Sequence, residues 1–504
     1  MPGDMDSRGM LAVFVQPDSS LDEDEFHEWY NNEHGPMRLQ VPCISTGARY
    51  RETDGVTTAW LAFYDLTSIS ILSDSSYRAL RDNRSEKEVR VLSGIPTRER
   101  KAGELISTKG GFSEDASVLV WVEMSLKDMA DEEELHRWYE EEHIKLLSKV
   151  PGWRRSRRYR LVDMDTHVPI NKFLAVHDYT LENGLDDSPE IQNARSTPWR
   201  TKIFSLLSSH TRRKTLERCY RFGAAPRDLL HLASAEKVID TYIPHDGYRL
   251  HYRLEGSVDD SSPVLIFCNG LNCDLHMWDA AIAPLKQRFP CFRFLRYDTR
   301  GYRFEGCDKP LTLDVVTLDI KALLEALLIQ KAHALIGVSM GGITTVAFAS
   351  RYPDRLEKFI ACDFAVCSDK ANEAAWDQRI QFAKDHGMEA LGKQSVERWF
   401  TPKSRGSPEW KKAISMVAAA SAKGMESSAK ILYNYDETEN LKGIRLPGLF
   451  VVGAKDGKCS EVMKGFVAAN ATNAVFREVE GAGHLPMIEN VGGFVDCVEE
   501  FLRA

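Results

Sequence analysis

Three residues in the C-terminal half of the chain have the types and the order of a nucleophile, an acid and a base. Ser339 lies between Gly337 and Gly341 in the segment GVSMGG, where the glycines permit the strained turn that exposes a nucleophilic hydroxyl. Asp456 ends the apolar segment GLFVVGAKD, and His484 lies in the loop GAGHLPMIEN. A histidine can activate the serine as a base, and an aspartate can hold the histidine in the required tautomer. The three residues together predict a Ser-His-Asp catalytic triad.

Each of the three residues also has an ordinary structural interpretation. The serine could lie in an exposed loop, the aspartate could simply end a strand, and the histidine could be a loop residue. The combination favours the triad, because all three occur in the order Ser, Asp, His after strand-like segments. Triad chemistry needs no metal and no cofactor, and neither is expected.

Backbone N–H groups should form an oxyanion hole beside the serine. Met340 follows the nucleophile and supplies one donor, and Leu271, in the loop after the strand-like run VLIFCNG, is the best candidate for the other. Asp298 and Arg300 lie in the turn DTRG, where an ion pair that fixes the turn is the commoner role.

The interval 366–440 interrupts the strand pattern with helical, Trp- and Lys-rich sequence and is predicted to form a cap over one end of a sheet. Trp376, Arg379 and Arg398 lie in it and could line a pocket. An arginine there could bind a substrate carboxylate through two parallel hydrogen bonds. The alternative is a cap helix whose arginines are merely solvated.

Strands and helices alternate through the C-terminal half. Apolar runs such as PVLIFCNG read as buried parallel strands, and helices are predicted at 312–329 and 341–351. This alternation predicts a mainly parallel α/β sheet in a domain over residues 238–504. A linker is predicted at 223–237.

The N-terminal half contains an internal repeat. HEWYNNEHGPMRLQVP (27–42) and HRWYEEEHIKLLSKVP (136–151) share the frame His-x-Trp-Tyr-x-x-Glu-His and end on Val-Pro. Strand-like segments flank both copies, so each reads as strand, helix, strand, strand and a helical tail. The repeat predicts two α+β units, at residues 8–107 and 115–222.

Each copy of the repeated helix carries a histidine, His34 and His143. On an α-helix Trp29 and Glu33 would share one face, as would Tyr30 and His34. A histidine next to a glutamate on such a helix suits a structural hydrogen bond. A binding or catalytic role for the two histidines is the alternative.

Composition limits the class of protein. The 504 residues are too many for one core, so two or three domains are expected. A hydrophobic fraction of 43%, a charged fraction of 28% and a net charge of −9 indicate a globular protein without a basic surface for nucleic acid. The polar, acidic opening MPGDMDSRGM, the lack of a long apolar run and the ten scattered cysteines favour a cytoplasmic protein that does not contact a membrane.

Residues 240–504 resemble the α/β-hydrolases of the 3-oxoadipate enol-lactonase branch. The matching stretches are NGLNCDLHMWD, LRYDTRGY, HALIGVSMGGITTVAFASRYPDRL, RWFTP, FVVGAKD and GAGHLPMIE. The resemblance implies an α/β-hydrolase fold with a helical cap. It also implies hydrolysis of an ester or lactone in which Ser339, His484 and Asp456 form the triad.

Residues 8–215 resemble the EthD-like group of the dimeric α+β-barrel superfamily, on the strength of the repeated frame. The resemblance implies two ferredoxin-like units whose sheets face each other and form a barrel. A homodimer is compatible with this pattern.

Several functions stay open at this level. The leading one is hydrolysis of an enol-lactone-like or polyketide-type ester or lactone, and the same triad supports cleavage of a C–C bond in a β-diketone. A bifunctional enzyme would have a barrel that binds or transforms a hydrophobic intermediate; a polar interior would favour it, and a filled apolar interior would exclude chemistry inside the barrel. A barrel that serves only as an interaction module is the third option.

Overall fold

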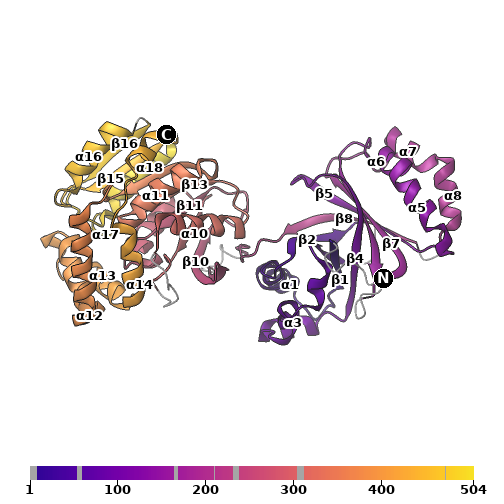
Figure 1. Cartoon of the computed structure of the whole chain (residues 1–504), viewed down its shortest axis with the longest axis horizontal. Helices are drawn as coiled ribbons and strands as arrows, with labels where there is room; N and C mark the ends of the chain where they lie inside the picture. The colour runs from indigo at the N-terminus through magenta and orange to yellow at the C-terminus, as the bar shows by residue number, and fades with distance from the viewer. Residues whose placement is uncertain are drawn as a thin grey trace. The chain divides into compact units, whose positions relative to one another are not determined.

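The chain forms two compact units, residues 1–224 and 225–504 (Figure 1). The computed structural model describes residues 8–53, 59–163, 169–208, 211–230, 238–302, 311–471 and 473–504. The second part of the predicted linker, residues 231–237, therefore lies outside the described residues. Among the described residues, no helix combines the length and the apolar content needed to cross a bilayer.

The first unit contains an eight-stranded antiparallel barrel that closes within the single chain. Its strands are β1 (Gly9–Gln16), β2 (Ile44–Glu52), β3 (Trp60–Leu66), β4 (Thr97–Gly110), β5 (Ala116–Met124), β6 (Trp153–Val162), β7 (Pro169–Thr180) and β8 (Arg212–Arg221). The order around the barrel is β1-β3-β2-β8-β5-β7-β6-β4. Each repeat thus contributes four strands, and the pairs β2–β8 and β4–β6 join the two repeats.

Alternate residues along each strand face the barrel interior, because successive side chains of a strand point to opposite faces. On β1 these residues are Met10, Ala12 and Phe14, which belong to one apolar cluster with Trp121 and Leu216. The ring centroids of Phe14 and Trp121 lie 5.2 Å apart in an edge-on arrangement. Side chains therefore fill the middle of the barrel.

Charged side chains on the same strand faces are paired with one another. Arg157 of β6 donates to Asp65 of β3 at 2.6 Å and to Asp178 of β7 at 3.0 Å. Buried charges are tolerated when they are paired in this way. An interior of apolar packing and ion pairs counts against chemistry inside the barrel.

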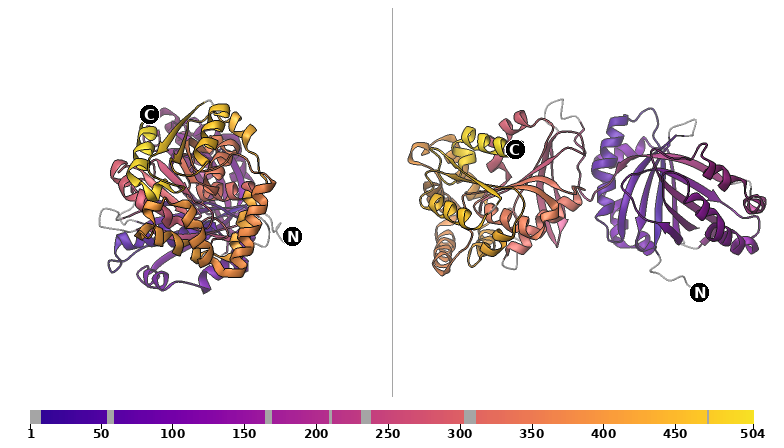
Figure 2. Two further views of the ribbon diagram at one scale, coloured as in Figure 1. Left: turned by 90° about the vertical axis from the view of Figure 1, so that its left-hand side faces the viewer. Right: turned by 90° about the horizontal axis from the view of Figure 1, so that it is seen from above.

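The helices of both repeats lie outside the barrel, on opposite sides of it (Figure 2, right-hand view). The first repeat contributes α1 (Glu23–Trp29), η1 (Tyr30–His34), α2 (Gly35–Leu39), α3 (Ser75–Asp82) and α4 (Glu86–Ser93). The second contributes α5 (Glu132–Trp138), η4 (Tyr139–His143), α6 (Ile144–Leu147), α7 (Pro189–Ser196) and α8 (Pro198–Leu206). Acidic residues open α1 and α5, where they complement the positive end of the helix dipole.

The repeated helix differs from the continuous α-helix that its sequence predicts. In both copies a π-helical turn, η1 or η4, separates two short α-helices. A π-turn closes its hydrogen bond one residue later than an α-turn, so side chains five residues apart become neighbours. The rings of Trp29 and His34 accordingly lie 4.4 Å apart, and those of Trp138 and His143 lie 4.2 Å apart.

The second unit is built on an eight-stranded sheet of order β16-β15-β14-β13-β11-β12-β10-β9. Its strands are β9 (Ile239–His245), β10 (Tyr248–Gly256), β11 (Val264–Cys268), β12 (Arg293–Tyr297), β13 (Ala332–Val338), β14 (Leu356–Cys362), β15 (Gly448–Gly453) and β16 (Ala474–Val479). The six strands β11 to β16 are parallel to one another, whereas β9 and β10 form an antiparallel edge. This sheet is the α/β-hydrolase fold that the sequence predicts for the C-terminal half.

Two sets of helices accompany the sheet (Figure 1). The helices that follow strands are α9 (Asp279–Arg288), α10 (Leu313–Ala326), α11 (Met340–Arg351), α16 (Cys459–Asn470), α17 (Pro486–Glu489) and α18 (Val491–Arg503). Between β14 and β15 the chain adds α12 (Lys370–Trp399), α13 (Pro408–Ala419), α14 (Ala422–Ala429) and α15 (Thr438–Gly443). We call this second set the cap.

Candidate active site

Ser339 lies on a sharp turn between β13 and α11. Its φ of 57° falls in the left-handed region, which costs a non-glycine residue roughly 1–3 kcal/mol. The flanking glycines make the turn feasible: a Cβ on Gly337 would lie 2.1 Å from the carbonyl oxygen of Gly341, and one on Gly341 would lie 2.2 Å from that of Cys268. The Ser339 amide donates to the Cys362 carbonyl at 2.9 Å and so fixes the turn to β14.

Asp456 and His484, the predicted acid and base, are hydrogen-bonded to each other. Asp456 follows β15, and its Oδ2 lies 2.8 Å from Nδ1 of His484. Burial raises the pKa of Asp456, but the hydrogen bond and charge of His484, together with hydrogen bonds from Cys459 and Asp363, outweigh burial, and the net pKa lies below its usual value. An ionised Asp456 is the state that holds a proton on Nδ1 and leaves Nε2 free to act as a base.

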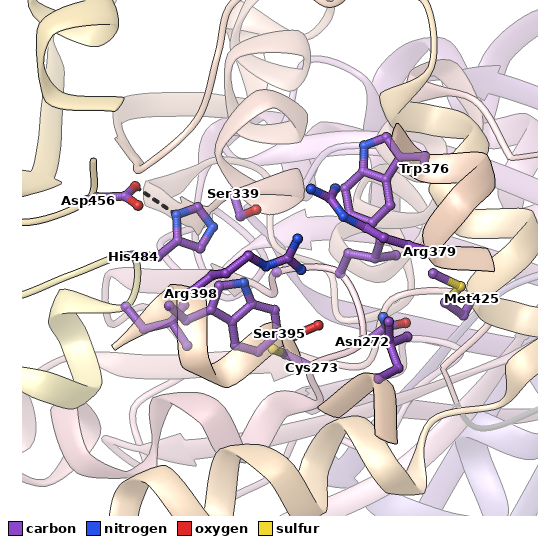
Figure 3. A pocket seen from close by; sticks show the side chains of 15 residues that line it. Asn272, Cys273, Ser339, Trp376, Arg379, Ser395, Arg398, Met425, Asp456 and His484 are labelled. Atoms are coloured by element: carbon purple, nitrogen blue, oxygen red, sulfur yellow. Dashed lines mark hydrogen bonds and ion pairs between the residues drawn. The ribbon is translucent and has the colours of Figure 1, made fainter. Parts of the chain in front are cut away.

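The histidine loop is fixed to the cap. The amide of His484 donates to the carbonyl of Trp399, at the end of α12, at 2.7 Å. Glu489 of α17 accepts from the amide of Gly483 at 2.7 Å and from the amide of Thr401 at 2.8 Å. These bonds hold the ring of His484 in place, and Figure 3 shows it between Asp456 and Ser339.

Two backbone segments meet at Ser339, as an oxyanion hole requires. Met340 is the first residue of α11, where the N–H groups of a helix have no acceptor in the helix. On the other side, a Cβ on Gly270 would lie 3.7 Å from Cβ of Ser339, so the loop that carries Leu271 passes close to the serine. Asn269 anchors this loop by donating to the carbonyl of Tyr297 at 2.8 Å.

A cavity of about 260 Å³ opens beside the serine. Ser339, Leu271, Asp456 and His484 line it together with the predicted cap residues Trp376, Arg379 and Arg398 (Figure 3). Met340 contributes its backbone at the elbow and is not among the lining side chains.

The two cap arginines have no acidic partner in the part of the chain that the structure describes. Among the described residues, neither Arg379 nor Arg398 forms an ion pair, although the guanidinium of Arg379 lies over the ring of Trp376 at 4.3 Å. Burial and the nearby Arg398 lower the pKa of Arg379 to about 10, and burial also lowers the pKa of Arg398. A negative group in the cavity would offset the repulsion between them.

Asp363 is a buried acid that the sequence reading did not single out. It follows β14, its side chain is fully buried, and its Oδ1 accepts from the amide of Gly453 at 2.9 Å. Atoms of Asp363, Asp456 and His484 lie within 4.8 Å of one another. Burial and the charge of Asp456 raise the pKa of Asp363 well above its usual value, which favours the neutral form of this carboxyl group. The position of Asp363 directly after an apolar, strand-like segment is the sequence feature that could have identified it.

The remaining sequence candidates lie elsewhere. Asp298 accepts from the amide of Leu275 at 2.8 Å, and Arg300 donates to Asp319 at 3.0 Å, which are framework roles. His34 and His143 belong to the first unit and do not line this cavity.

Comparisons with known proteins concern the part of the chain that carries this cavity. A model of the "Alpha/beta hydrolase family" matches residues 265–496. The 3-oxoadipate enol-lactonase 2 of Acinetobacter baylyi is 31% identical over 258 residues, which cover 50% of this chain and 93% of the relative. The 3-oxoadipate enol-lactonase 1 of the same bacterium is 28% identical over 247 residues, which cover 49% of this chain and 90% of the relative. The solved enol-lactonase of Burkholderia xenovorans aligns with a TM-score of 0.49 at 30% identity, over 52% of this chain and 100% of that chain.

Proposed function

The chain belongs to the α/β-hydrolase family and is a hydrolase related to enol-lactonases, and from that premise we propose that it hydrolyses a small, negatively charged ester or lactone. The observation that carries the proposal is the hydrogen-bonded pair of Asp456 and His484, which shares a cavity with a serine on a strained elbow. Ester hydrolysis through an acyl-enzyme is the chemistry that this arrangement supports best.

In the first half of the reaction, Oγ of Ser339 attacks the ester carbonyl while Nε2 of His484 takes its proton. The N–H groups of Met340 and Leu271 stabilise the negative charge that develops on the carbonyl oxygen. Asp456 stabilises the imidazolium that forms. The tetrahedral intermediate collapses, the C–O bond of the ester breaks, and the imidazolium returns the proton to the leaving oxygen.

The second half of the reaction releases the carboxylic acid product. A water molecule gives a proton to His484 and attacks the acyl carbon, and the same N–H groups stabilise the second tetrahedral intermediate. Its collapse breaks the bond to Ser339, and the proton returns to Oγ. For a lactone, the alcohol or enol released in the first half and the acid released in the second belong to one molecule.

The cavity supports a small anionic substrate. Ligand cavities in proteins commonly have volumes of about 300–1,000 Å³, and about 260 Å³ suits a small lactone better than a large polyketide product. Arg379 and Arg398 bring positive charge into the cavity, and an arginine can bind a carboxylate through two parallel hydrogen bonds. Cleavage of a C–C bond in a β-diketone by the same residues is the alternative reaction.

For the first unit we propose a tandem pair of ferredoxin-like, EthD-like repeats. The strand order supports it, because the first repeat runs β4-β1-β3-β2 and the second runs β8-β5-β7-β6, which is the same arrangement twice. A barrel with a filled interior favours a role other than chemistry in the barrel centre.

The test is hydrolysis of a small panel by the wild type and by Ser339→Ala. The panel holds 3-oxoadipate enol-lactone, a neutral aryl ester and a β-diketone. We expect the anionic lactone to give the highest kcat/KM, and Ser339→Ala to lower its kcat by roughly 10⁴-fold or more, since the nucleophile is lost. Faster turnover of the β-diketone would instead identify C–C bond hydrolysis.

Ser395→Ala provides a matched control. Ser395 lines the same cavity with a buried hydroxyl but does not lie on the elbow, so most of the activity should remain. In the same assay, Arg379→Gln together with Arg398→Gln should raise KM for the lactone by about tenfold and leave the neutral ester unaffected. Equal losses in Ser339→Ala and Ser395→Ala would contradict the assignment of the nucleophile.

A further inference from the structure

The first unit contains two cavities at equivalent places in its two repeats. Each lies on the outer side of the barrel, between the sheet and the helices of one repeat. The lining residues correspond at a constant offset in the sequence: Val13 and Val122, Val15 and Met124, Trp29 and Trp138, Tyr30 and Tyr139, His34 and His143, and Arg38 and Leu147. The duplication has therefore produced the same cavity twice, each beside a π-helical turn.

The cavity of the first repeat, which we call the arginine cavity, is strongly basic. It has a volume of about 360 Å³, and five arginines line it, Arg38, Arg81, Arg84, Arg98 and Arg100. No aspartate or glutamate is among its lining residues. Within the described part of the chain, none of the five arginines forms an ion pair, on a protein whose net charge is −9.

Arginine charges affect a buried histidine at the floor of the cavity, His34. His34 is almost completely buried, and its Nδ1 lies 2.9 Å from Oε1 of Glu88. Burial and the charges of Arg38, Arg84, Arg49 and Arg100 lower the pKa of His34 well below its usual value. Five like charges around one cavity repel one another, and a bound anion would remove that cost.

The floor is apolar and aromatic. The side chains of Trp29 and Tyr30 are each only 1% exposed, and both line the cavity beside Ile95 and Leu92. The indole Nε1 of Trp29 is buried and has no hydrogen-bond partner among the described residues. A buried donor without a partner costs free energy, and a ligand oxygen would satisfy it.

We propose that the arginine cavity binds an organic anion with an aromatic or apolar body and at least two negative charges, carried by carboxylate or phosphate groups. The body packs on Trp29 and Tyr30, and the arginines around the cavity bind the charges. The cavity of the second repeat has Leu147 in place of Arg38 and only three lining arginines, Arg195, Arg200 and Arg213. The two cavities thus share a floor and differ in charge.

The test measures binding by isothermal titration calorimetry at matched ionic strength, with isophthalate, benzoate, phenyl phosphate and inorganic phosphate as probes. The protein carries Arg379→Gln and Arg398→Gln, so that the cavity beside Ser339 does not supply a competing anion site. We expect isophthalate or phenyl phosphate to bind at least about tenfold more tightly than benzoate or inorganic phosphate, because both have a ring and more than one negative charge. Whichever binds more tightly identifies carboxylate or phosphate as the preferred group.

Arg81→Gln together with Arg84→Gln should weaken this binding at least about tenfold. Both residues are exposed and form no ion pair with any described residue, so the variant should fold normally. Arg90→Gln is the matched control, because Arg90 lies on α4, pairs with Glu25 and does not line the cavity. No binding of either organic dianion, or binding that survives loss of the two arginines, would overturn the proposal. Equal affinity for inorganic phosphate and isophthalate would overturn the role of the aromatic floor.

Discussion

The pKa values of two neighbouring aspartates in the second unit are shifted in opposite directions because their surroundings differ. Asp456 bonds to His484, which keeps its pKa low, whereas Asp363 is fully buried and lies beside the negative charge of Asp456. Two carboxyl groups this close cannot both ionise at little cost, so the more deeply buried one keeps its proton. The charge that stabilises His484 therefore resides on Asp456.

This difference predicts opposite results for the same chemical change. Asp456→Asn should lower kcat by roughly 10⁴-fold, because an amide favours the wrong tautomer of His484. Asp363→Asn should change kcat by less than about threefold, because it replaces a group that is already neutral with one of the same shape. Steady-state assays with the best substrate of the panel check both values. A large loss in Asp363→Asn, with a normal unfolding temperature, would show that Asp363 carries the charge.

Residue types and order were enough to predict the cavity beside the serine. Ser339, Asp456, His484 and Leu271 line one cavity, as their positions after strands suggested, and the candidates from the predicted cap line it with them. Their catalytic and binding roles stay predictions. The arginine cavity was not foreseen, since its arginines are scattered over residues 38–100 in helices, a loop and a strand, and only the fold gathers them.

Among the elements, the kinked cap helix α12 contributes most to the cavity beside the serine. At Gly387 the backbone has a φ of 83° and a ψ of 165°, a conformation that is essentially restricted to glycine. Trp376 and Arg379 lie before the kink, and Ser395 and Arg398 lie after it. Because the helix bends at Gly387, both arms can line one cavity.

Gly387→Ala should destabilise the second unit by about 1–3 kcal/mol through backbone strain alone. A Cβ at this position would meet no atom within 4 Å, so no clash contributes. We expect KM to rise more than kcat falls, since the cap arms bind substrate while the triad stays in place. Urea unfolding and steady-state kinetics measure the two effects.

Gly465→Ala is the control for this substitution. Gly465 lies inside α16, a Cβ there also meets no atom within 4 Å, and its φ is not positive. Alanine is the better helix former, so this variant should be about 0.5–1 kcal/mol more stable than the wild type. A Gly387→Ala protein as stable as the wild type would indicate that α12 has no strained kink.

Element types were predictable where the hydrophobic pattern is regular. The apolar runs of the second unit predicted the buried parallel strands. The matched segments of the repeat predicted strands on both sides of a helix. The π-helical turns were not predictable, because the sequence HEWYNNEH suits a continuous α-helix equally well. Packing of Trp29 against His34 distinguishes the two, and that contact depends on the folded sheet.

At the scale of the whole molecule, buried histidines affect the stability of the two units in opposite directions. Burial lowers the pKa of His34 and His143 well below the usual value, and it lowers that of His177 to about 4. In the second unit, burial alone would lower the pKa of His251, but hydrogen bonds to Asp298 and Asp240 outweigh burial and raise it. Folding therefore weakens proton binding by these histidines of the first unit, whereas it strengthens proton binding by His251 in the second unit.

The first unit should lose stability in acid before the second. Unfolded histidines have a pKa of about 6.5, so below that pH the unfolded first unit binds more protons than the folded one. Each such histidine then removes roughly 1.4 kcal/mol per pH unit, down to its own folded pKa. The raised pKa of His251 acts in the reverse sense: its contribution is complete below the unfolded pKa and disappears as the pH rises. Hydrogen exchange in urea at pH 5.5 and pH 7.5 measures both units, and equal losses in acid would contradict this expectation.

The fold of the second half followed from sequence, whereas closure of the barrel did not. The repeat predicted two α+β units, and the second half predicted one α/β sheet, which the family match confirms. Whether the barrel forms within one chain or between two depends on the pairs β2–β8 and β4–β6, and no local sequence pattern encodes them. Ferredoxin-like units of the EthD-like group stay a prediction for the repeats.

The pairing of β2 with β8 also sets the order of events during synthesis. Ala48 of β2 pairs with Arg221 of β8, so one edge of the first four strands has no partner until almost the whole unit has left the ribosome. Unpaired strand edges are templates for aggregation, and contacts between distant parts of a chain form slowly. The growing chain consequently passes through a stage in which half a barrel is exposed.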